Sequence, residues 1–314
     1  MRILALVFGI LCTAMAIGQI IPDFPYNGVG RPFLVRVRRP LSADGDLTAA
    51  LLLPDAKPLG SAVPVGEGRQ DLAKLFPALW TAKDARVLHA QLFAGGKAVG
   101  PSLVLQPMTI PQLSRLRADG KTVEFAPDEG QAYAGIRAWV DKDIVFDTTL
   151  GKMRFRMRPD CAPNTAWNIM QLVTGGFYRD VIWHRVVKMS HGFPFVIQGG
   201  DPTGTGDGGP GFAYPLEDSS LPHDFGVISI ARDTDPNTNG CQVFVCLSRD
   251  GTSRLDHKYA SFGECIEGRD TILKIADVPV GKEDRPNNPP VIRDAKLVDS
   301  APFGTGPAPV RREG

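Results

Sequence analysis

The chain has 314 residues and a formal net charge of +1, from 35 Lys and Arg against 34 Asp and Glu. General nucleic-acid binders usually carry a basic excess or a basic stripe, so we expect no nucleic-acid partner. The hydrophobic fraction of 43% is ordinary for a globular protein, and the length suggests about two domains. The high content of Gly and Pro favours many turns between short strands, which predicts a mainly β protein.

The first 18 residues resemble a signal peptide. Arg2 supplies a positive charge, residues 3–12 form an apolar core, and Ala16 and Gly18 provide small residues for cleavage. The apolar run is short for a membrane span, and no basic cluster follows it. We therefore expect an exported protein, periplasmic or secreted, with no membrane span after signal removal. A retained N-terminal anchor is the alternative.

Four cysteines remain after the signal: Cys161, Cys241, Cys246 and Cys265. An even number in an exported protein permits disulfides, and four buried thiols are the other reading. Cys241 and Cys246 are expected in one strand, five residues apart, where they face opposite sides and do not pair. No cysteine or histidine cluster has zinc spacing, so we expect no metal.

The first half of the chain is expected to hold a small domain. We interpret residues 19–30 as a linker and residues 31–110 as a β-rich, sandwich-like domain of unknown role. Its predicted strands span 33–38, 47–53, 87–93 and 98–105, the last two forming a hairpin around Gly95 and Gly96. A short helix is predicted over 71–80. Residues 111–135 are interpreted as a connection, with a short helix over 112–116.

The second half is expected to form another β-rich unit over residues 136–300, followed by a flexible tail over 301–314. Two strands are predicted over 144–150 and 152–157. Pro163 is predicted to lie in the first turn of a helix, because proline fits that position, and Gly175 and Gly176 end it. Trp167 and Met170 recur at helical spacing and are expected in the core.

Several short blocks follow in a fixed order. They are Tyr178; His184-Arg185; Phe195-Val196-Ile197-Gln198-Gly199-Gly200-Asp201; Gly240-Cys241-Gln242-Val243-Phe244; Leu255-Asp256; and Phe262-Gly263. This order resembles the cyclophilin family of peptidyl-prolyl cis–trans isomerases over about residues 140–300. The resemblance implies a closed eight-stranded antiparallel barrel capped by two helices, one after Pro163 and one near 271–276. It also implies protein-folding activity on X–Pro bonds without any cofactor.

The resemblance further implies the residues of the site. Arg185 and Gln198 would be catalytic, and proline-containing polypeptides would be the partners of a monomeric protein. Arginine is always charged and can donate a hydrogen bond to the proline nitrogen of a twisted amide. The implied substrate-binding residues are Phe195, Val196, Ala231, Arg232, Gln242, Phe244, Leu255 and Tyr259. Along the strand, Phe244 is expected to share a face with Gln242 and Cys246.

The sequence also departs from the family. Arg254 stands where the family usually has Trp, and Tyr259 stands where it usually has His. Val196 stands where Met is common, and residues 188–193 form an insertion. A catalytically weak module that binds proline-containing peptides is therefore the alternative function. In a third hypothesis the N-terminal domain is the functional half and the second unit is a scaffold.

Two other patterns in the sequence do not indicate a functional site. The Gly-rich stretch 204–211 lacks the Lys-Ser/Thr ending of a phosphate-binding loop. Asp201 and Glu217 have no feature that would place them as the carboxylate pair of a glycosidase.

Overall fold

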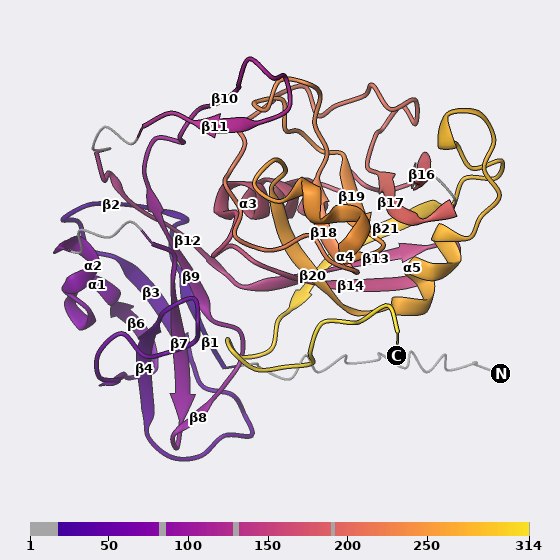
Figure 1. Cartoon of the computed structure of the whole chain (residues 1–314). Helices are drawn as coiled ribbons and strands as arrows, with labels where there is room; N and C mark the ends of the chain where they lie inside the picture. The colour runs from indigo at the N-terminus through magenta and orange to yellow at the C-terminus, as the bar shows by residue number, and fades with distance from the viewer. Residues whose placement is uncertain (1–17, 82–85, 128–131, 190–191, 314) are drawn as a thin grey trace, which may run out of the picture.

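The computed structural model describes residues 18–81, 86–127, 132–189 and 192–313 (Figure 1). The predicted signal peptide therefore lies, except for Gly18, outside the described residues. In the part of the chain that is described, no helix has both the length and the apolar character needed to cross a membrane.

Two antiparallel sheets built from the first half of the chain share one hydrophobic core. The smaller sheet has the order β1-β3-β6, with β1 at Gln19–Pro22, β3 at Leu34–Arg38 and β6 at Gly68–Asp71. The larger has the path β2 (Tyr26–Gly28), β12 (Gly135–Val140), β9 (Leu103–Met108), β7 (Leu88–Ala94), β4 (Leu47–Leu52) and β5 (Val63–Pro64), with β8 (Lys97–Ala98) on β7. Val35 from one sheet and Leu51 and Ala90 from the other meet in the core.

Three features of this half differ from expectation. Residues 19–30 hold β1 and β2 rather than a linker, because their backbones pair with β3 and β12 and Ile20 enters the core. Residues 135–140 belong to the first-half sheet as β12, rather than to the second unit. The predicted helix over 71–80 is two short helices, α1 (Leu72–Leu75) and α2 (Ala78–Thr81), separated at Pro77.

The prediction of a short helix over 112–116 was wrong. Ser114–Leu116 form strand β10, which pairs with β11 (Val123–Phe125). Gly120, with a φ of 64°, lies in the turn between them. A five-residue helix forms too few hydrogen bonds to offset its nucleation cost, whereas the hairpin satisfies the backbone. Ser114 is also bonded to the Asn237 side chain of the second half.

The second half forms one nine-stranded antiparallel sheet. Its path is β15 (Val181–Ile182), β21 (Val291–Asp299), β13 (Lys142–Thr148), β14 (Gly151–Met157), β20 (Ser261–Glu267), β18 (Val227–Ile230), β19 (Val243–Cys246), β17 (Pro194–Gly199) and β16 (Arg185–Lys188). The described pairings show a mainly β unit with one sheet of nine strands, and its closure into the expected eight-stranded barrel stays a prediction. The two end strands, β15 and β16, are joined by only Trp183 and His184.

Helices α3 (Pro163–Thr174) and α5 (Arg269–Ala276) pack on this sheet, and both confirm predictions from the sequence. Ile169 of α3 and Ile272 of α5 enter the same core as Phe146 of β13. The first turn of α3 is stabilised by Glu217, whose carboxylate accepts hydrogen bonds from the Asn164 and Thr165 amides at 2.8 and 2.7 Å. The remaining short helices of the described chain are α4 (Arg249–Thr252), η2 (Ser253–Leu255) and η3 (Lys282–Asp284).

Residues 301–313, here termed the C-terminal strap, link the two cores instead of forming a flexible tail. Phe303 stacks on His89 of β7 with ring centroids 3.5 Å apart, and its amide donates to Gln91. The strap then returns to the nine-stranded sheet of the second half, where the Val310 amide donates to the Cys265 carbonyl and Arg312 donates to the Leu247 carbonyl (Figure 1). These bonds order a segment whose Gly- and Pro-rich sequence suggested mobility.

Candidate active site

Strand register places the predicted site residues in one row across the sheet. Arg185 of β16 lies opposite Gln198 of β17, and Gln198 lies opposite Phe244 of β19. Phe244 in turn lies opposite Ser229 of β18. Residues directly opposite each other in antiparallel strands project from the same face, so these side chains are neighbours on one face.

The alternating residues of the same strands point the other way. Val186, Ile197, Val245 and Ile228 are all fully buried members of the main core. Because side chains alternate along a strand, this burial fixes which residues face outward. The prediction that Phe244 and Cys246 share a face is confirmed, since both belong to a separate apolar cluster on the outer side.

That outer cluster, here termed the apolar pocket, gathers most of the predicted substrate-binding residues. Val196 and Phe244 are buried at its centre. The half-buried members at its edge are Phe195, Ala231, Leu255, Tyr259 and Val187. The Tyr259 ring meets the Phe244 ring edge-on, with centroids 5.6 Å apart. These half-buried side chains present an aromatic and aliphatic surface beside the buried Phe244 ring.

A groove of about 500 Å³ lies beside the pocket, and it is lined by Ala231 of the pocket and by three further predicted residues, Gln198, Arg232 and Gln242. Gln198 Nε2 donates to Gln242 Oε1 at 3.0 Å, and Gln242 Nε2 donates to the carbonyls of Gly206 and Gly208. These bonds fix the amide orientations. The side-chain carbonyl oxygen of Gln198 takes no part in these bonds and can accept a bond from a peptide N–H.

The glycine-rich side of the groove is held by Asp201. Its carboxylate accepts bonds from the Thr203 and Gly206 amides at 2.7 and 2.5 Å. Burial opposes its charged form, yet these hydrogen bonds lower the pKa of Asp201 to about 2. Asp201 thus shapes its own loop, and Glu217 caps α3, so the two carboxylates serve separate structural roles.

Arg185, at the end of the row, is nearly half exposed. Its guanidinium faces an acidic residue that the sequence did not predict as part of the site. Nη2 lies 3.4 Å from Oδ2 of Asp284 in η3. Asp284 and its neighbour Glu283 both have a φ near +60°, a conformation that non-glycine residues rarely adopt. Arg285, the next residue, donates to the Gly204 carbonyl at 2.6 Å, which fastens this loop to the groove.

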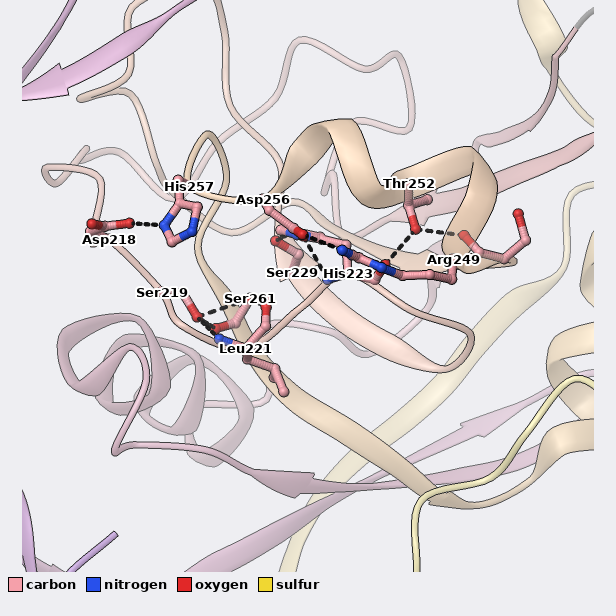
Figure 2. A network of polar contacts seen from close by, with 11 residues as sticks. Asp218, Ser219, Leu221, His223, Ser229, Arg249, Thr252, Asp256, His257 and Ser261 are labelled. Atoms are coloured by element: carbon pink, nitrogen blue, oxygen red, sulfur yellow. Dashed lines mark hydrogen bonds and ion pairs between the residues drawn. The ribbon is translucent and has the colours of Figure 1, made fainter. Parts of the chain in front are cut away.

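A polar network lies next to Phe244 and includes His223, Asp256, Ser229 and Arg249, which Figure 2 shows. The His223 ring stacks on Phe244 with centroids 5.9 Å apart, and its two nitrogens contact Asp256 and Ser229 at 3.0 Å. Asp256 also accepts a bond from Arg249 at 2.7 Å. Burial opposes the charge of Asp256, but the bonds from Arg249 and His223 lower its pKa to about 2. This network supports Phe244 and positions the turn that carries Leu255 and Tyr259.

Two arginines cover aromatic rings at the rim of the pocket. Arg254, exposed in η2, has its guanidinium carbon 4.7 Å from the centre of the Phe195 ring. Arg232 lies 4.6 Å from the centre of the Tyr259 ring, and it donates to the Lys258 carbonyl at 2.9 and 3.2 Å. The rim is therefore cationic where the family usually has a tryptophan.

All four cysteines of the described chain are free and buried. Cys161 and Cys246 border the apolar pocket. Burial raises the pKa of Cys161 to about 11 and the pKa values of Cys241 and Cys265 to about 12. They are the buried thiols that the sequence left as one of two alternatives.

The sheet and its outer side chains together define a mainly β protein with a surface groove beside a partly buried aromatic and aliphatic cluster. Residues 143–297 match the family model described as cyclophilin type peptidyl-prolyl cis-trans isomerase/CLD. The match to peptidyl-prolyl cis-trans isomerase-like 1 of Neurospora crassa is 38% identical and covers 50% of this chain and 94% of that relative. The chain belongs to the cyclophilin-type peptidyl-prolyl cis-trans isomerase family.

Further similarities concern the same half of the chain. Peptidyl-prolyl cis-trans isomerase CYP18-2 of Arabidopsis thaliana is 34% identical over 50% of this chain and 94% of its own length. A crystal structure of a cyclophilin type peptidyl-prolyl cis-trans isomerase of Cryptosporidium parvum, determined in the presence of the dipeptide Ala-Pro, has a TM-score of 0.46. It is 31% identical, and the match covers 50% of this chain and 98% of that one.

Proposed function

We propose that this protein accelerates cis–trans rotation about X–Pro bonds in exported polypeptides, with Arg185 as the catalytic hydrogen-bond donor. The observation that carries the proposal is the row Arg185–Gln198–Phe244, in which a cation, an amide and a buried aromatic ring share one face. Family membership supports the activity. The roles of the individual residues rest on the geometry.

The mechanism follows from the barrier itself. Amide resonance sets a barrier of about 18–20 kcal/mol to rotation, and a catalyst must favour the twisted amide over the planar one. Twisting gives the proline nitrogen a lone pair that can accept a bond from Arg185. Phe195, Val196, Phe244 and Leu255 would hold the ring in an apolar setting, which suits the less polar twisted amide. Gln198 would bond the substrate backbone.

The flanking peptide would lie along the groove. Main-chain groups of Ala231 and Arg232 line it together with Gln242. The Ala231 amide already donates to the Gln242 carbonyl at 2.8 Å, so the remaining donors and acceptors of this segment would bind the peptide. No covalent bond is broken or made in this scheme, and therefore no nucleophile or cofactor takes part in it.

The activity is tested by NMR exchange spectroscopy on a proline peptide with wild type and Arg185→Ala. We expect acceleration by wild type and a loss of at least about 100-fold in the variant, a magnitude typical of removing one preorganised donor. Binding without acceleration would instead support the weak peptide-binding module. That alternative is favoured by the Arg185–Asp284 ion pair, which already engages the guanidinium. Acceleration that survives in Arg185→Ala would refute the arginine mechanism alone.

Export is proposed from the signal-peptide pattern of residues 1–18. Mass spectrometry of the mature N-terminus, with fractionation of the host cells, tests it. A mature chain that starts after Ala16 or Gly18 in the exported fraction is expected. An intact Met1 in the cytoplasmic fraction would refute it.

Two further points complete the proposal. If β15 and β16 count as one bent strand through Trp183 and His184, the nine-stranded path contains eight strands, and we propose that it closes as a barrel. We also propose a monomer that has no nucleic-acid partner, as the balanced charge favours. Light scattering of the purified protein tests the oligomeric state.

A further inference from the structure

Arg254 occupies a defined place at the edge of the apolar pocket. Its guanidinium carbon lies 4.7 Å from the centre of the Phe195 ring, and Phe195 and Leu255 are both members of the pocket. An arginine over an aromatic face is attracted to the ring but keeps its full charge. A positive charge therefore lies at the edge of the apolar pocket, over the Phe195 ring.

The short helical segment that carries Arg254 is fastened to the rest of the site. Ser248 Oγ donates to the Pro194 carbonyl of β17 at 2.9 Å and accepts a bond from the Gly251 amide. Thr252 Oγ1 donates to the His223 carbonyl at 2.8 Å. A Cβ on Gly251 would meet the Pro194 carbonyl oxygen at 2.8 Å, so the helix packs directly on the strand. The backbone that carries Arg254 is thus fixed relative to Phe195.

The guanidinium of Arg254 has no carboxylate partner among the described residues. The nearby carboxylate of Asp256 is engaged by Arg249 and by both the amide and the ring of His223. Asp250 lies four residues before Arg254, yet none of the ion pairs of residues 18–81, 86–127, 132–189 and 192–313 includes Arg254. Of the other arginines of the site, Arg185 has Asp284 as its partner, and Arg232 donates to the carbonyls of Lys258, Asp233 and Thr234. Within the part of the chain that is described, the Arg254 guanidinium makes no hydrogen bond, so a substrate can pair with it at no cost to an existing bond.

The geometry points to Arg254 as a specificity-determining residue that selects X–Pro segments with an anionic side chain next to the proline. This inference rests on the proposed function and names its substrate class. A guanidinium matches the bidentate geometry of a carboxylate or a phosphate, so Asp, Glu and phosphoserine share the required chemistry. The pocket would hold the proline ring while Arg254 binds the anion beside it.

The test uses the full mature chain and peptides that differ at one residue. Each peptide places Gln, Glu, Ser or phosphoserine either just before or just after a single proline. NMR exchange gives kcat/KM, and chemical-shift titration gives Kd. The variants are Arg254→Gln, Arg254→Lys and, as a matched control, Arg36→Gln. Arg36 is an exposed arginine of β3 in the other half of the chain, and its removal changes the net charge equally.

Wild type is expected to prefer Glu over Gln by about 5-fold or more at one of the two positions, with the preference declining as salt is added. The ratio should fall close to 1 in Arg254→Gln, recover in part in Arg254→Lys, and remain unchanged in Arg36→Gln. A preference for phosphoserine over Ser without one for Glu over Gln would identify phosphate as the anion.

An anion preference that is equal in wild type and Arg254→Gln, or absent from wild type, overturns the inference. If no peptide is turned over, including the neutral ones, isomerase activity is refuted instead. The Kd values then decide the role of Arg254. Tighter binding of the anionic peptide that is lost in Arg254→Gln supports it, and equal binding overturns it.

Discussion

The Arg185 guanidinium lies 3.4 Å from the Asp284 carboxylate, although 99 residues separate the two in the sequence. Both side chains are more than a third exposed, so the ion pair is screened by water and worth at most about 1 kcal/mol. It nevertheless engages the group proposed to contact the proline nitrogen. A substrate must compete with Asp284 for the same guanidinium.

Removing Asp284 is therefore expected to favour the contact between the substrate and Arg185. In Asp284→Ala, kcat/KM should rise by up to about 5-fold at low ionic strength, which corresponds to about 1 kcal/mol, and the gain should shrink in high salt. Glu283→Gln is the matched control, because Glu283 pairs with Lys282 instead. A fall in kcat/KM at every salt concentration would show that Asp284 orients Arg185 for catalysis rather than competing for it.

Phe244 is expected to serve both binding and stability. Its ring is 5% exposed between His223 and Tyr259. Phe244→Leu should cost about 1.5 kcal/mol or less of unfolding free energy, yet lower kcat/KM by about 10-fold or more, because the aromatic face of the pocket is lost.

Phe262→Leu is the control for that substitution. Phe262 is fully buried in the main core, on the side away from the pocket. Its loss should reduce the unfolding free energy, measured by urea denaturation, while kcat/KM stays within about 2-fold of wild type. Equal catalytic losses in the two variants would mean that Phe244 acts only through stability.

His89 should make stability depend on pH. Burial lowers the pKa of His89 to about 3 in the folded protein, against 6.5 when it is exposed on unfolding. Between these values the unfolded chain binds a proton that the folded protein excludes. Stability from this residue is therefore intact above pH 6.5 and falls by about 1.4 kcal/mol per pH unit as the pH drops towards 3.

The comparison variant is His89→Gln, which keeps a polar atom near Ser102, the neighbour of His89 Nδ1 at 3.0 Å. Burial raises the pKa of Asp141 to about 7, which gives an opposite trend in part of this range, so only the difference between the variants isolates His89. Urea unfolding at pH 7 and pH 5 should show wild type losing about 2 kcal/mol more than the variant. Parallel losses would contradict the assignment.

The four cysteines are expected to be unreactive in the native state. Their thiols are buried and their pKa values are raised, so little thiolate exists at pH 8. An alkylating reagent should label none of them before unfolding and all four after it, and reductant should leave Tm unchanged. A reductant-dependent Tm would reveal a disulfide.

Local pattern and the ordered blocks allowed much of the second half to be predicted. Alternation placed Phe244 and Cys246 on one face, and Pro163 marked the start of α3. The Arg185–Asp284 pair could not be predicted, because it depends on a loop that folds back from a distant part of the chain.

The structure of the first half was harder to predict for a related reason. β1, β2 and β10 are short, and their pairing partners rather than their own residues determine their structure. The sequence shows that Arg254 departs from the family pattern. Its position over the Phe195 ring could not be predicted, because it depends on how η2 folds against β17. Sequence patterns report local preference, whereas these features arise from contacts between segments.

The C-terminal strap has a consequence for local unfolding. Phe303 covers the His89 ring, and the strap also bonds the Cys265 and Leu247 carbonyls. Detachment of the strap would expose His89 to water, while the Ser114–Asn237 and Arg137–Asn164 bonds would still join the two halves. Opening of the strap would therefore be a local event that leaves the sheets intact.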